Sequence, residues 1–360
     1  MHHIVDVEGL LGREILSFTD RYRNRLTNAA LAYWRAAGFP YPTVSAAEIR
    51  RELDNLAASD NHINGHARGL LSTVGVRVAN ASHPQLWRIK TRGKSCVDIF
   101  ADDDRLRRAL TRAPLFWPDR RCWNAQSIRA MMRISHKMRP SNFRPVVARQ
   151  LIRAFSDDGD CVFDFSAGFG GRLLGAVSLD RTYIGIDPAR AQISGLRRLY
   201  GCVKEYVPGR SRLYEACAED LLPDFSSQSA DLIISSPPYF DTERYSAEEN
   251  QSYLRYSELP QWIESFLSPV LRHSARILKP GGVMLLNVTD RKDINLKRFT
   301  IDLCVPRLEF LGWIPYCMRI NPGCQSRVAW KNEPILVFQK PPVNCNAIHR
   351  KIRTFSGRIA

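Results

Sequence analysis

A turn with two consecutive prolines carries the residue types for unusual chemistry. Ser236, Pro237, Pro238 and Tyr239 directly follow an apolar run at residues 232–234. The prolines fix the backbone and remove two N–H donors, so carbonyl oxygens dominate the turn, and the tyrosine adds a flat ring. An amine conjugated to an aromatic ring is a poor nucleophile, but acceptors that bind its hydrogens can aim its lone pair. We expect the Ser236 hydroxyl and the Pro237 carbonyl to be such acceptors, with Tyr239 stacking on the ring. An ordinary Pro-Pro loop is the weaker interpretation, because the turn follows a fourth apolar strand.

A glycine-rich turn earlier in the chain could hold a ligand through its backbone. The apolar run that carries Asp164 is followed by Gly168 and Gly170. Glycines let the backbone approach a ligand closely, and the start of the next helix supplies free N–H groups. A nicotinamide-binding turn would have a third glycine where this chain has Leu173, so the sequence disfavours a dehydrogenase.

Acidic residues follow the next two predicted strands. Asp187 ends the run at residues 182–187, where a carboxylate can accept hydrogen bonds from both hydroxyls of a ribose. The alternative is that Asp187 caps the next helix, and the glycine turn upstream favours the ribose. Glu219 and Asp220 follow the third strand, where one of them could receive an adenine amino group or simply begin a helix.

The elements that would position these residues alternate between strands and helices, which predicts an α/β fold with a doubly wound, mostly parallel, seven-stranded sheet. The last two strands are joined by a loop too short for a helical crossover, so they should pair antiparallel. The helix that we expect at 259–278 ends at a Lys-Pro-Gly-Gly stop signal. Strands are expected at 161–166, 182–187, 211–216, 230–235, 282–288, 313–320 and 333–340, and further helices at 171–179 and 189–200.

The region before residue 136 has a mainly helical pattern. Helices are expected at 46–56, where Ser45 and Glu48 form a capping box, and at 106–112. Four of the seven tryptophans lie in this region, enough aromatic surface for a core of its own. We therefore predict a helical domain at 1–135, a catalytic domain at 136–342 and a basic tail at 343–360.

The chain is basic, with 52 Lys/Arg against 36 Asp/Glu and a net charge of +16. Residues 1–140 alone hold 23 Lys/Arg and 13 Asp/Glu, a net charge of +10. Such an excess, mostly arginine, indicates a polyanionic partner such as nucleic acid, although scattered solvated charges would also keep a protein in solution. Candidate phosphate contacts lie beside Tyr22 and after Trp87; they are Arg21, Arg23, Arg25, Arg88, Lys90, Arg92 and Lys94.

Cysteine usage and hydropathy exclude several classes. The nine cysteines form no C-x-x-C pair, so we expect neither a metal site nor a disulfide framework. The sequence shows no signal peptide and no apolar stretch long enough for a membrane span. We expect a cytoplasmic, nucleoid-associated protein.

The motif at 236–239 resembles the [DNS]-P-P-[YFW] motif of the class I amino-methyltransferases, and the resemblance covers roughly residues 140–340. It implies S-adenosylmethionine as cofactor, with Asp164, Ser166, Gly168 and Gly170 around its methionine part. Asp187 would hold the ribose, and Glu219 or Asp220 would lie near the adenine. Phe143 resembles the aromatic residue of an element that precedes the glycine turn and packs on the methionine end.

The resemblance also implies a reaction and a partner. Serine in the first motif position is most typical of the DNA cytosine-N4 enzymes and occurs in some adenine-N6 enzymes. The order of the motifs, cofactor before catalytic, differs from the permuted class in which S-P-P-Y often occurs. We expect a site-specific methyltransferase of double-stranded DNA that flips its target base, N4 of cytosine preferred, either solitary or paired with a restriction endonuclease. The alternative targets are adenine N6 in DNA and an RNA base, and a noncatalytic nucleic-acid-binding protein is a further alternative. Recognition of the nucleic acid would fall to residues 1–135.

Overall fold

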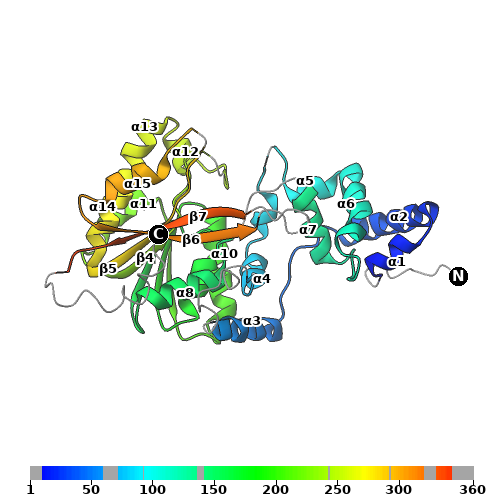
Figure 1. Cartoon of the computed structure of the whole chain (residues 1–360), viewed down its shortest axis with the longest axis horizontal. Coiled ribbons are helices and arrows are strands. Elements are labelled where there is room, and N and C mark those ends of the chain that lie inside the picture. The colour runs from blue at the N-terminus through cyan, green and yellow to red at the C-terminus, as the bar shows by residue number, and fades with distance from the viewer. Residues whose placement is uncertain are drawn as a thin grey trace. The chain divides into compact units, whose positions relative to one another are not determined.

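The computed structural model describes residues 10–59, 72–91, 93–135, 142–241, 244–291, 293–319 and 330–342. The chain forms two compact units, and both are discontinuous in sequence (Figure 1). The helical unit comprises Met1–Thr43 and Pro84–Ser141, and the sheet unit comprises Val44–His83 and Asn142–Ala360.

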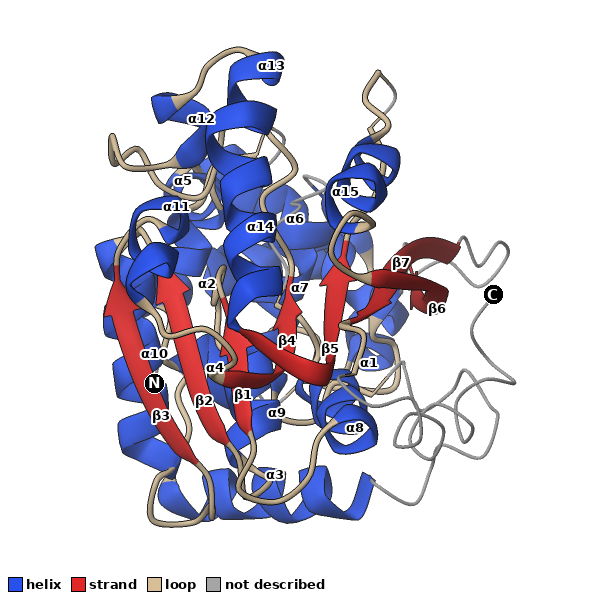
Figure 2. Ribbon diagram, turned by 90° about the vertical axis from the view of Figure 1, so that its left-hand side faces the viewer, coloured by secondary structure: helices blue, strands red, loops and turns tan. Residues whose placement is uncertain are grey.

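The sheet unit contains one seven-stranded sheet in the order β3-β2-β1-β4-β5-β7-β6 (Figure 2). The first five strands are parallel, and β7 runs antiparallel to both β5 and β6. The strands are β1 (Cys161–Asp164), β2 (Thr182–Asp187), β3 (Arg210–Glu215), β4 (Ala230–Ser235), β5 (Leu278–Asn287), β6 (Glu309–Arg319) and β7 (Trp330–Gln339).

This topology confirms the predicted fold class. The strands expected at 182–187 and 230–235 have the observed bounds, and the terminal antiparallel pair is present. The expected loop between the last two strands lies mostly outside the described residues. The expected helix at 259–278 is one helical run, but β5 already begins at Leu278, so the Lys-Pro-Gly-Gly signal lies within that strand. The run widens into a π-helical turn at Ile263–Leu267, just before Pro269, which lacks the N–H of a regular α-helix.

Helices cover both faces of the sheet because successive strand residues point to opposite sides. Val162 and Leu232 pack with α3, α4, α8, α9 and α10, whereas Phe163 and Ile233 pack with α11, α13, α14 and α15. The helices of this unit are α3 (Ala46–Ala58), α4 (Val76–Ala81), α8 (Pro145–Phe155), α9 (Gly171–Val177), α10 (Arg190–Val203), α11 (Ala218–Leu221), α12 (Ser252–Arg255), α13 (Leu259–Trp262), α14 (Ser268–Ile277) and α15 (Leu296–Cys304).

The segment 44–83 differs from the sequence-based division of the chain. Its helix α3 begins with the predicted capping box, in which Ser45 and Glu48 satisfy each other's backbone N–H groups. Leu53 and Leu56 of this helix are buried in the same core as α8, α9 and α10. A single boundary at 135/136 therefore does not describe the two compact units, because apolar contacts place residues 44–83 with the sheet. The expected tail at 343–360 lies outside the described residues.

The helical unit confirms the mainly helical prediction for the N-terminal region and has its own aromatic core. Trp34 Nε1 donates to Trp123 O (3.2 Å), and Trp123 Nε1 donates to Leu110 O (2.9 Å). Buried Arg129 bonds Pro40 O (2.5 Å) and lies over the Trp87 ring. The helices of this unit are α1 (Gly12–Ser17), α2 (Asp20–Ala37), α5 (Cys96–Ala101), α6 (Asp103–Phe116) and α7 (Ala125–Ser135), with a 3-10 turn at Pro84–Arg88.

No helix among the described residues is both long enough and apolar enough to span a membrane.

Candidate active site

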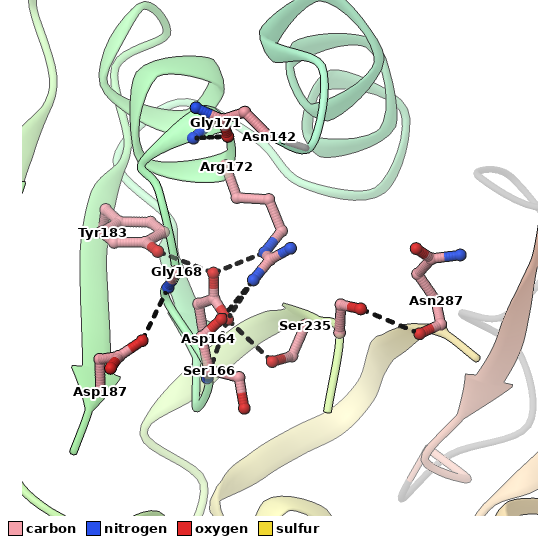
Figure 3. Close-up of polar contacts among 11 residues, drawn as sticks. Asn142, Asp164, Ser166, Gly168, Gly171, Arg172, Tyr183, Asp187, Ser235 and Asn287 are labelled. Carbon is pink, nitrogen blue, oxygen red and sulfur yellow. Dashed lines mark hydrogen bonds and ion pairs between the residues drawn. The ribbon is translucent and has the colours of Figure 1, made fainter. Parts of the chain in front are cut away.

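Asp164, at the end of β1, is the centre of a buried polar network (Figure 3). Arg172 Nε donates to Asp164 Oδ2 (2.6 Å), and Tyr183 OH donates to the same oxygen (2.7 Å). Ser235 Oγ and the Ser166 N–H donate to Asp164 Oδ1 at 2.8 Å and 3.1 Å. Asp164 is completely buried and nearly all of Arg172 is as well, so this ion pair is isolated from water.

Protein donors reach both oxygens of Asp164, so its carboxylate organises the turn. Its place beside the methionine part of the cofactor stays a prediction. Burial opposes the charge of Arg172, but the adjacent Asp164 carboxylate raises the pKa of that guanidinium above its ordinary value. Burial, and then the same carboxylate, raise the pKa of Tyr183 well above its ordinary value, so the phenol stays a donor.

The cofactor turn, residues 166–171, has the backbone that its glycines predict. Gly168 and Gly170 have φ values of +58° and +81°, in the left-handed region that favours glycine. At Gly171 a Cβ atom would lie only 1.8 Å from Phe143 O, so no larger residue fits there. Asn142 Oδ1 accepts from the Gly171 N–H (3.0 Å), which fixes the turn to the start of α8. No local sequence pattern singles out Asn142, whose role depends on its contact with a turn 29 residues away.

Phe143 and Ser166 lie beside this turn. The Phe143 ring lies under the Arg172 guanidinium, 5.4 Å from its centre, and packs against Tyr316. Ser166 O accepts from Arg172 Nη2. Both residues thus contact the Arg172 side of the turn, and direct contact with methionine stays a prediction for each.

Asp187, at the end of β2, bonds the backbone at the start of α10, as the capping alternative predicts, and its ribose role stays a prediction. Its Oδ2 accepts from the Gly168 N–H (3.0 Å), and its Oδ1 accepts from the Ala189 N–H (3.0 Å) at the start of α10. Each carboxylate oxygen has a further lone pair, so hydroxyls can still be accepted. Burial raises the pKa of this carboxyl to about 7.

Glu219 and Asp220 share one cation, Arg255. Arg255 Nη1 lies 2.6 Å from Glu219 Oε1 and 2.7 Å from Asp220 Oδ2. Glu219 Oε2 is buried and has no hydrogen-bond partner among the described residues. Burial raises the pKa of Glu219. In the described part of the chain, these two acids and Cys217 are a group whose spacing could suit a metal ion, but Arg255 already supplies their positive charge.

A crossing segment, residues 244–256, contacts the chain after each of β1, β2 and β3. The Tyr245 ring packs edge-on against Phe169 of the cofactor turn. Glu248 Oε2 accepts from the Arg190 N–H (3.2 Å) at the start of α10, and Asn250 Nδ2 donates to Pro188 O (2.7 Å). With Arg255 on Glu219 and Asp220, this segment borders the whole cofactor edge of the sheet. No local sequence pattern predicts this position of the segment, because only the tertiary fold brings it to the strand ends.

Two hydroxyls of the catalytic turn, residues 236–240, donate to the same backbone carbonyl. Ser236 Oγ donates to Asn287 O (3.2 Å), and Tyr239 OH donates to the same oxygen (3.1 Å). Asn287 ends β5, the strand beside β4 (Figure 3). Phe240 closes the turn with a φ of +56°, which is uncommon for a bulky residue and typical of strain at functional sites.

The structure changes the expectation for Tyr239. Its ring is only 6% exposed and packs in the apolar cluster with Trp262, and its hydroxyl is anchored. An open ring face for a stacked base is thus not present here, and stacking stays a prediction. Ser236 is partly exposed, as an acceptor for a substrate requires.

The cofactor edge fits S-adenosylmethionine on its donors and acceptors. The left-handed glycine turn leads into α9 with Gly168 half-buried, and Asp187 offers lone pairs at the next strand end. The buried, unpartnered Glu219 Oε2 lies after the third strand, where it suits an amino donor such as that of adenine.

Comparison with known proteins gives one family match. The family described as DNA methylase matches residues 230–356, roughly a third of the chain, and this range includes the catalytic turn. No curated protein matches the chain.

Solved structures are similar only at low levels. TrmN from Thermus thermophilus is 18% identical with a TM-score of 0.39, over 54% of this chain and 48% of that protein, so the chain spans about half of its length. A putative RNA methyltransferase from Pyrococcus horikoshii is 14% identical with a TM-score of 0.37, over 55% and 83%. A TehB-like SAM-dependent methyltransferase from Corynebacterium glutamicum is 16% identical with a TM-score of 0.35, over 56% and 89%.

At such TM-scores these structures carry no weight, and the assignment rests on the motif, the strand order and the family match. Residues 230–356 are therefore similar to the DNA methylase family, and the strand order and site residues of the sheet unit fit an S-adenosylmethionine-dependent methyltransferase.

Proposed function

We propose that this enzyme methylates an exocyclic amine of a base in double-stranded DNA, with N4 of cytosine as the preferred target. One observation carries the chemistry. The Ser236 hydroxyl gives its proton to Asn287 O, so its oxygen can present only lone pairs to a substrate. A hydroxyl fixed in this way is an obligate acceptor, and an acceptor is what an aromatic amine needs.

The residues of the catalytic turn would activate the amine. Ser236 Oγ and the Pro237 carbonyl would accept the two amine hydrogens, which draws the nitrogen lone pair out of conjugation and orients it. S-adenosylmethionine would supply an electrophilic methyl group, its sulfur leaving as a neutral thioether, and the methylated nitrogen would lose one proton to solvent. Because Pro237 and Pro238 have no N–H, the backbone of the turn offers no donor at these positions that would compete for that lone pair. The turn therefore favours a neutral amine over an anionic nucleophile.

The cofactor would be held along the edges of β1, β2 and β3. Backbone groups of Gly168 and Gly170 would face its methionine part, Asp187 would accept the ribose hydroxyls, and Glu219 would accept the adenine amine. Asp220 also bonds Arg255 and would keep this arginine in place beside Glu219.

The choice of DNA is supported by the family description and by charge. The helical unit holds 19 Lys/Arg against 9 Asp/Glu, whereas residues 44–83 hold four of each, so the whole N-terminal excess belongs to the helical unit. Arg21, Arg25, Arg88 and Lys90 are exposed there and suit phosphate contacts. Arg23 is half-buried and bonded to Asp20, Lys94 is half-buried, and Arg92 lies outside the described residues. Nucleoid association would follow from such binding.

The cytosine preference rests on serine in the first motif position. Adenine N6 in DNA and an RNA base are the alternative targets, and a noncatalytic nucleic-acid-binding role is a further alternative. The fixed acceptor at Ser236 supports catalysis over that last role. A restriction endonuclease as partner would require that its cleavage sites coincide with the methylated sites.

Nucleoside mass spectrometry tests the proposal. The full chain is incubated with methyl-labelled S-adenosylmethionine and, in parallel, with duplex DNA and with RNA. We expect labelled N4-methylcytosine from duplex DNA, and labelling that is slower by roughly 10²- to 10³-fold with Ser236→Ala. Labelled N6-methyladenine alone would overturn the cytosine preference, and label confined to RNA would overturn the choice of DNA. Cofactor binding by calorimetry without any methylated product would favour the noncatalytic role.

A further inference from the structure

Asn287 lies where the β5–β7 ladder loses its regular donors. Asn287 pairs with Ile335 at the end of this ladder, and the next residue of β7 is Pro334. Pro334 in turn faces Pro315 of β6. Neither proline has an N–H, so this part of the sheet is poor in backbone donors.

The carboxamide of Asn287 adds a side-chain donor beside these prolines. Its Nδ2 donates to Pro334 O (3.3 Å) and, at the limit of hydrogen-bond distance, to Glu333 O (3.5 Å). The Val288 N–H donates to the same Pro334 carbonyl (3.3 Å). Asn287 is 5% exposed, so these bonds are shielded from water. The side chain thus fixes the end of β5 against β7.

The opposite side of the same residue faces the catalytic turn. Its backbone carbonyl takes the protons of both Ser236 and Tyr239, which uses its two lone pairs. We propose that Asn287 is a positioning residue for the target-amine site, whose side-chain amide anchors β5 on β7 so that its carbonyl fixes both hydroxyl protons.

Loss of this anchor would change the direction in which the Ser236 hydroxyl points its proton. If the carbonyl shifts, the Ser236 hydroxyl is free to rotate and donate to the amine nitrogen. Such a bond would occupy the lone pair that must attack the methyl group. Loss of the Asn287 amide should therefore slow methyl transfer without weakening cofactor or DNA binding.

The inference rests on the proposed function. Its test compares kcat with the binding of S-adenosylmethionine and of DNA in the full chain. We expect Asn287→Ala to lower kcat by about 10- to 100-fold, by analogy with the loss of groups that orient the ligands of a metal ion. The KM for DNA and the affinity for S-adenosylmethionine should change by less than about twofold. Asn287→Ser keeps one donor, should fall between these limits, and serves if the alanine variant does not fold. Asn295→Ala is the control, because Asn295 only caps α15 and should leave kcat unchanged.

A Ser236→Asn background separates a positioning role of Asn287 from a general disruption of the site. In Ser236→Asn the acceptor is a carbonyl oxygen that carries no proton, so its action no longer depends on Asn287 O. There Asn287→Ala should cost less than about threefold in kcat. Equal losses in the two backgrounds, or a wild-type kcat in Asn287→Ala, would overturn the positioning role and leave the proposed function intact. An inactive Ser236→Asn variant would instead overturn the acceptor role of residue 236, and the inference with it.

Discussion

Two turns at neighbouring strand ends of one sheet are fixed by opposite means. The cofactor turn after β1 is tied to a fully buried carboxylate that receives charged, phenolic, hydroxyl and backbone donors. The catalytic turn after β4 is tied by two neutral hydroxyls to one backbone carbonyl. Charged hydrogen bonds are roughly twice as strong as neutral ones, so the first turn is the more strongly held. The second leaves a hydroxyl oxygen available for chemistry.

The adjacent residues Ser235 and Ser236 contribute to different turns of this pair. Ser235 is buried and donates to Asp164 of β1, whereas Ser236 donates to Asn287 of β5. Consecutive residues can bond opposite neighbours because β4 lies between β1 and β5. Ser235 and Ser236 are therefore a matched pair for separating the contribution of each turn.

The largest effect should come from breaking the charged network. Arg172→Ala leaves Asp164 buried without its cation, which costs about 3–5 kcal/mol in the free energy of unfolding. Chemical denaturation measures this loss. Arg298→Ala, which breaks an exposed ion pair with Asp302, is the matched control and should cost less than about 1 kcal/mol. Similar losses for both variants would show that the Asp164 network is not a special support.

The next effect separates the two serines. Ser236→Ala should lower kcat by roughly 10²- to 10³-fold, the cost of removing one group aimed at the reacting centre, with cofactor affinity unchanged. Ser235→Ala should lower the stability of the cofactor turn, because it removes one donor to Asp164. Single-turnover kinetics and calorimetry distinguish these outcomes. If Ser235→Ala lost more turnover than Ser236→Ala at saturating cofactor, the catalytic role of Ser236 would be wrong.

Local patterns in the sequence predict the turns well but not what holds them. The strands at 182–187 and 230–235 are apolar runs bounded by polar or proline residues, so the sequence predicts both the strands and their ends. The motifs at 168–170 and 236–239 follow their strands directly. Tyr183 and Ser235 meet Asp164 only because β1 pairs with both β2 and β4, and no pattern within one segment shows that pairing.

Non-local packing also explains the other differences. Asn287 ends an ordinary apolar strand, and only the β4–β5 register brings it beside the catalytic turn. Residues 44–83 look like part of a helical N-terminal region, yet buried leucines of α3 join the sheet core. The unpartnered oxygen of Glu219 depends on how Arg255 approaches from the crossing segment.

A smaller effect should follow from the pKa of Asp187. Because burial raises this pKa to about 7, the folded chain binds the proton more tightly than the unfolded chain does. The contribution of Asp187 to the free energy of unfolding therefore falls as pH rises from about 4 to about 7. Cofactor binding should show the reverse trend, since the ionised form accepts hydroxyls best. Affinity should fall by up to about tenfold per pH unit below 7.

Calorimetry across pH 5.5–8 tests the role of Asp187 in cofactor binding. Asp187→Asn cannot titrate, so its weaker affinity should vary little over this range. An equal pH dependence in the wild type and in this variant would assign the titration to another group.

The smallest effect should come from single charges of the helical unit, which contribute to neither turn. Arg25→Gln should reduce the slope of log affinity for duplex DNA against log salt by about 0.9, the value for one phosphate contact, and Arg21→Gln/Arg25→Gln by about twice that. Point variants are preferable to deletion of residues 1–135, which would also remove α3 from the core of the sheet unit. Fluorescence anisotropy at several salt concentrations measures the slopes, with exposed Arg298→Gln of the sheet unit as control.

Cofactor affinity and kcat at saturating DNA should stay unchanged in these variants, because charges that only attract phosphate act before the base reaches the catalytic turn. Equal slopes in all variants would move the phosphate contacts away from α2, and a fall in kcat would show that the helical unit also shapes one of the two turns.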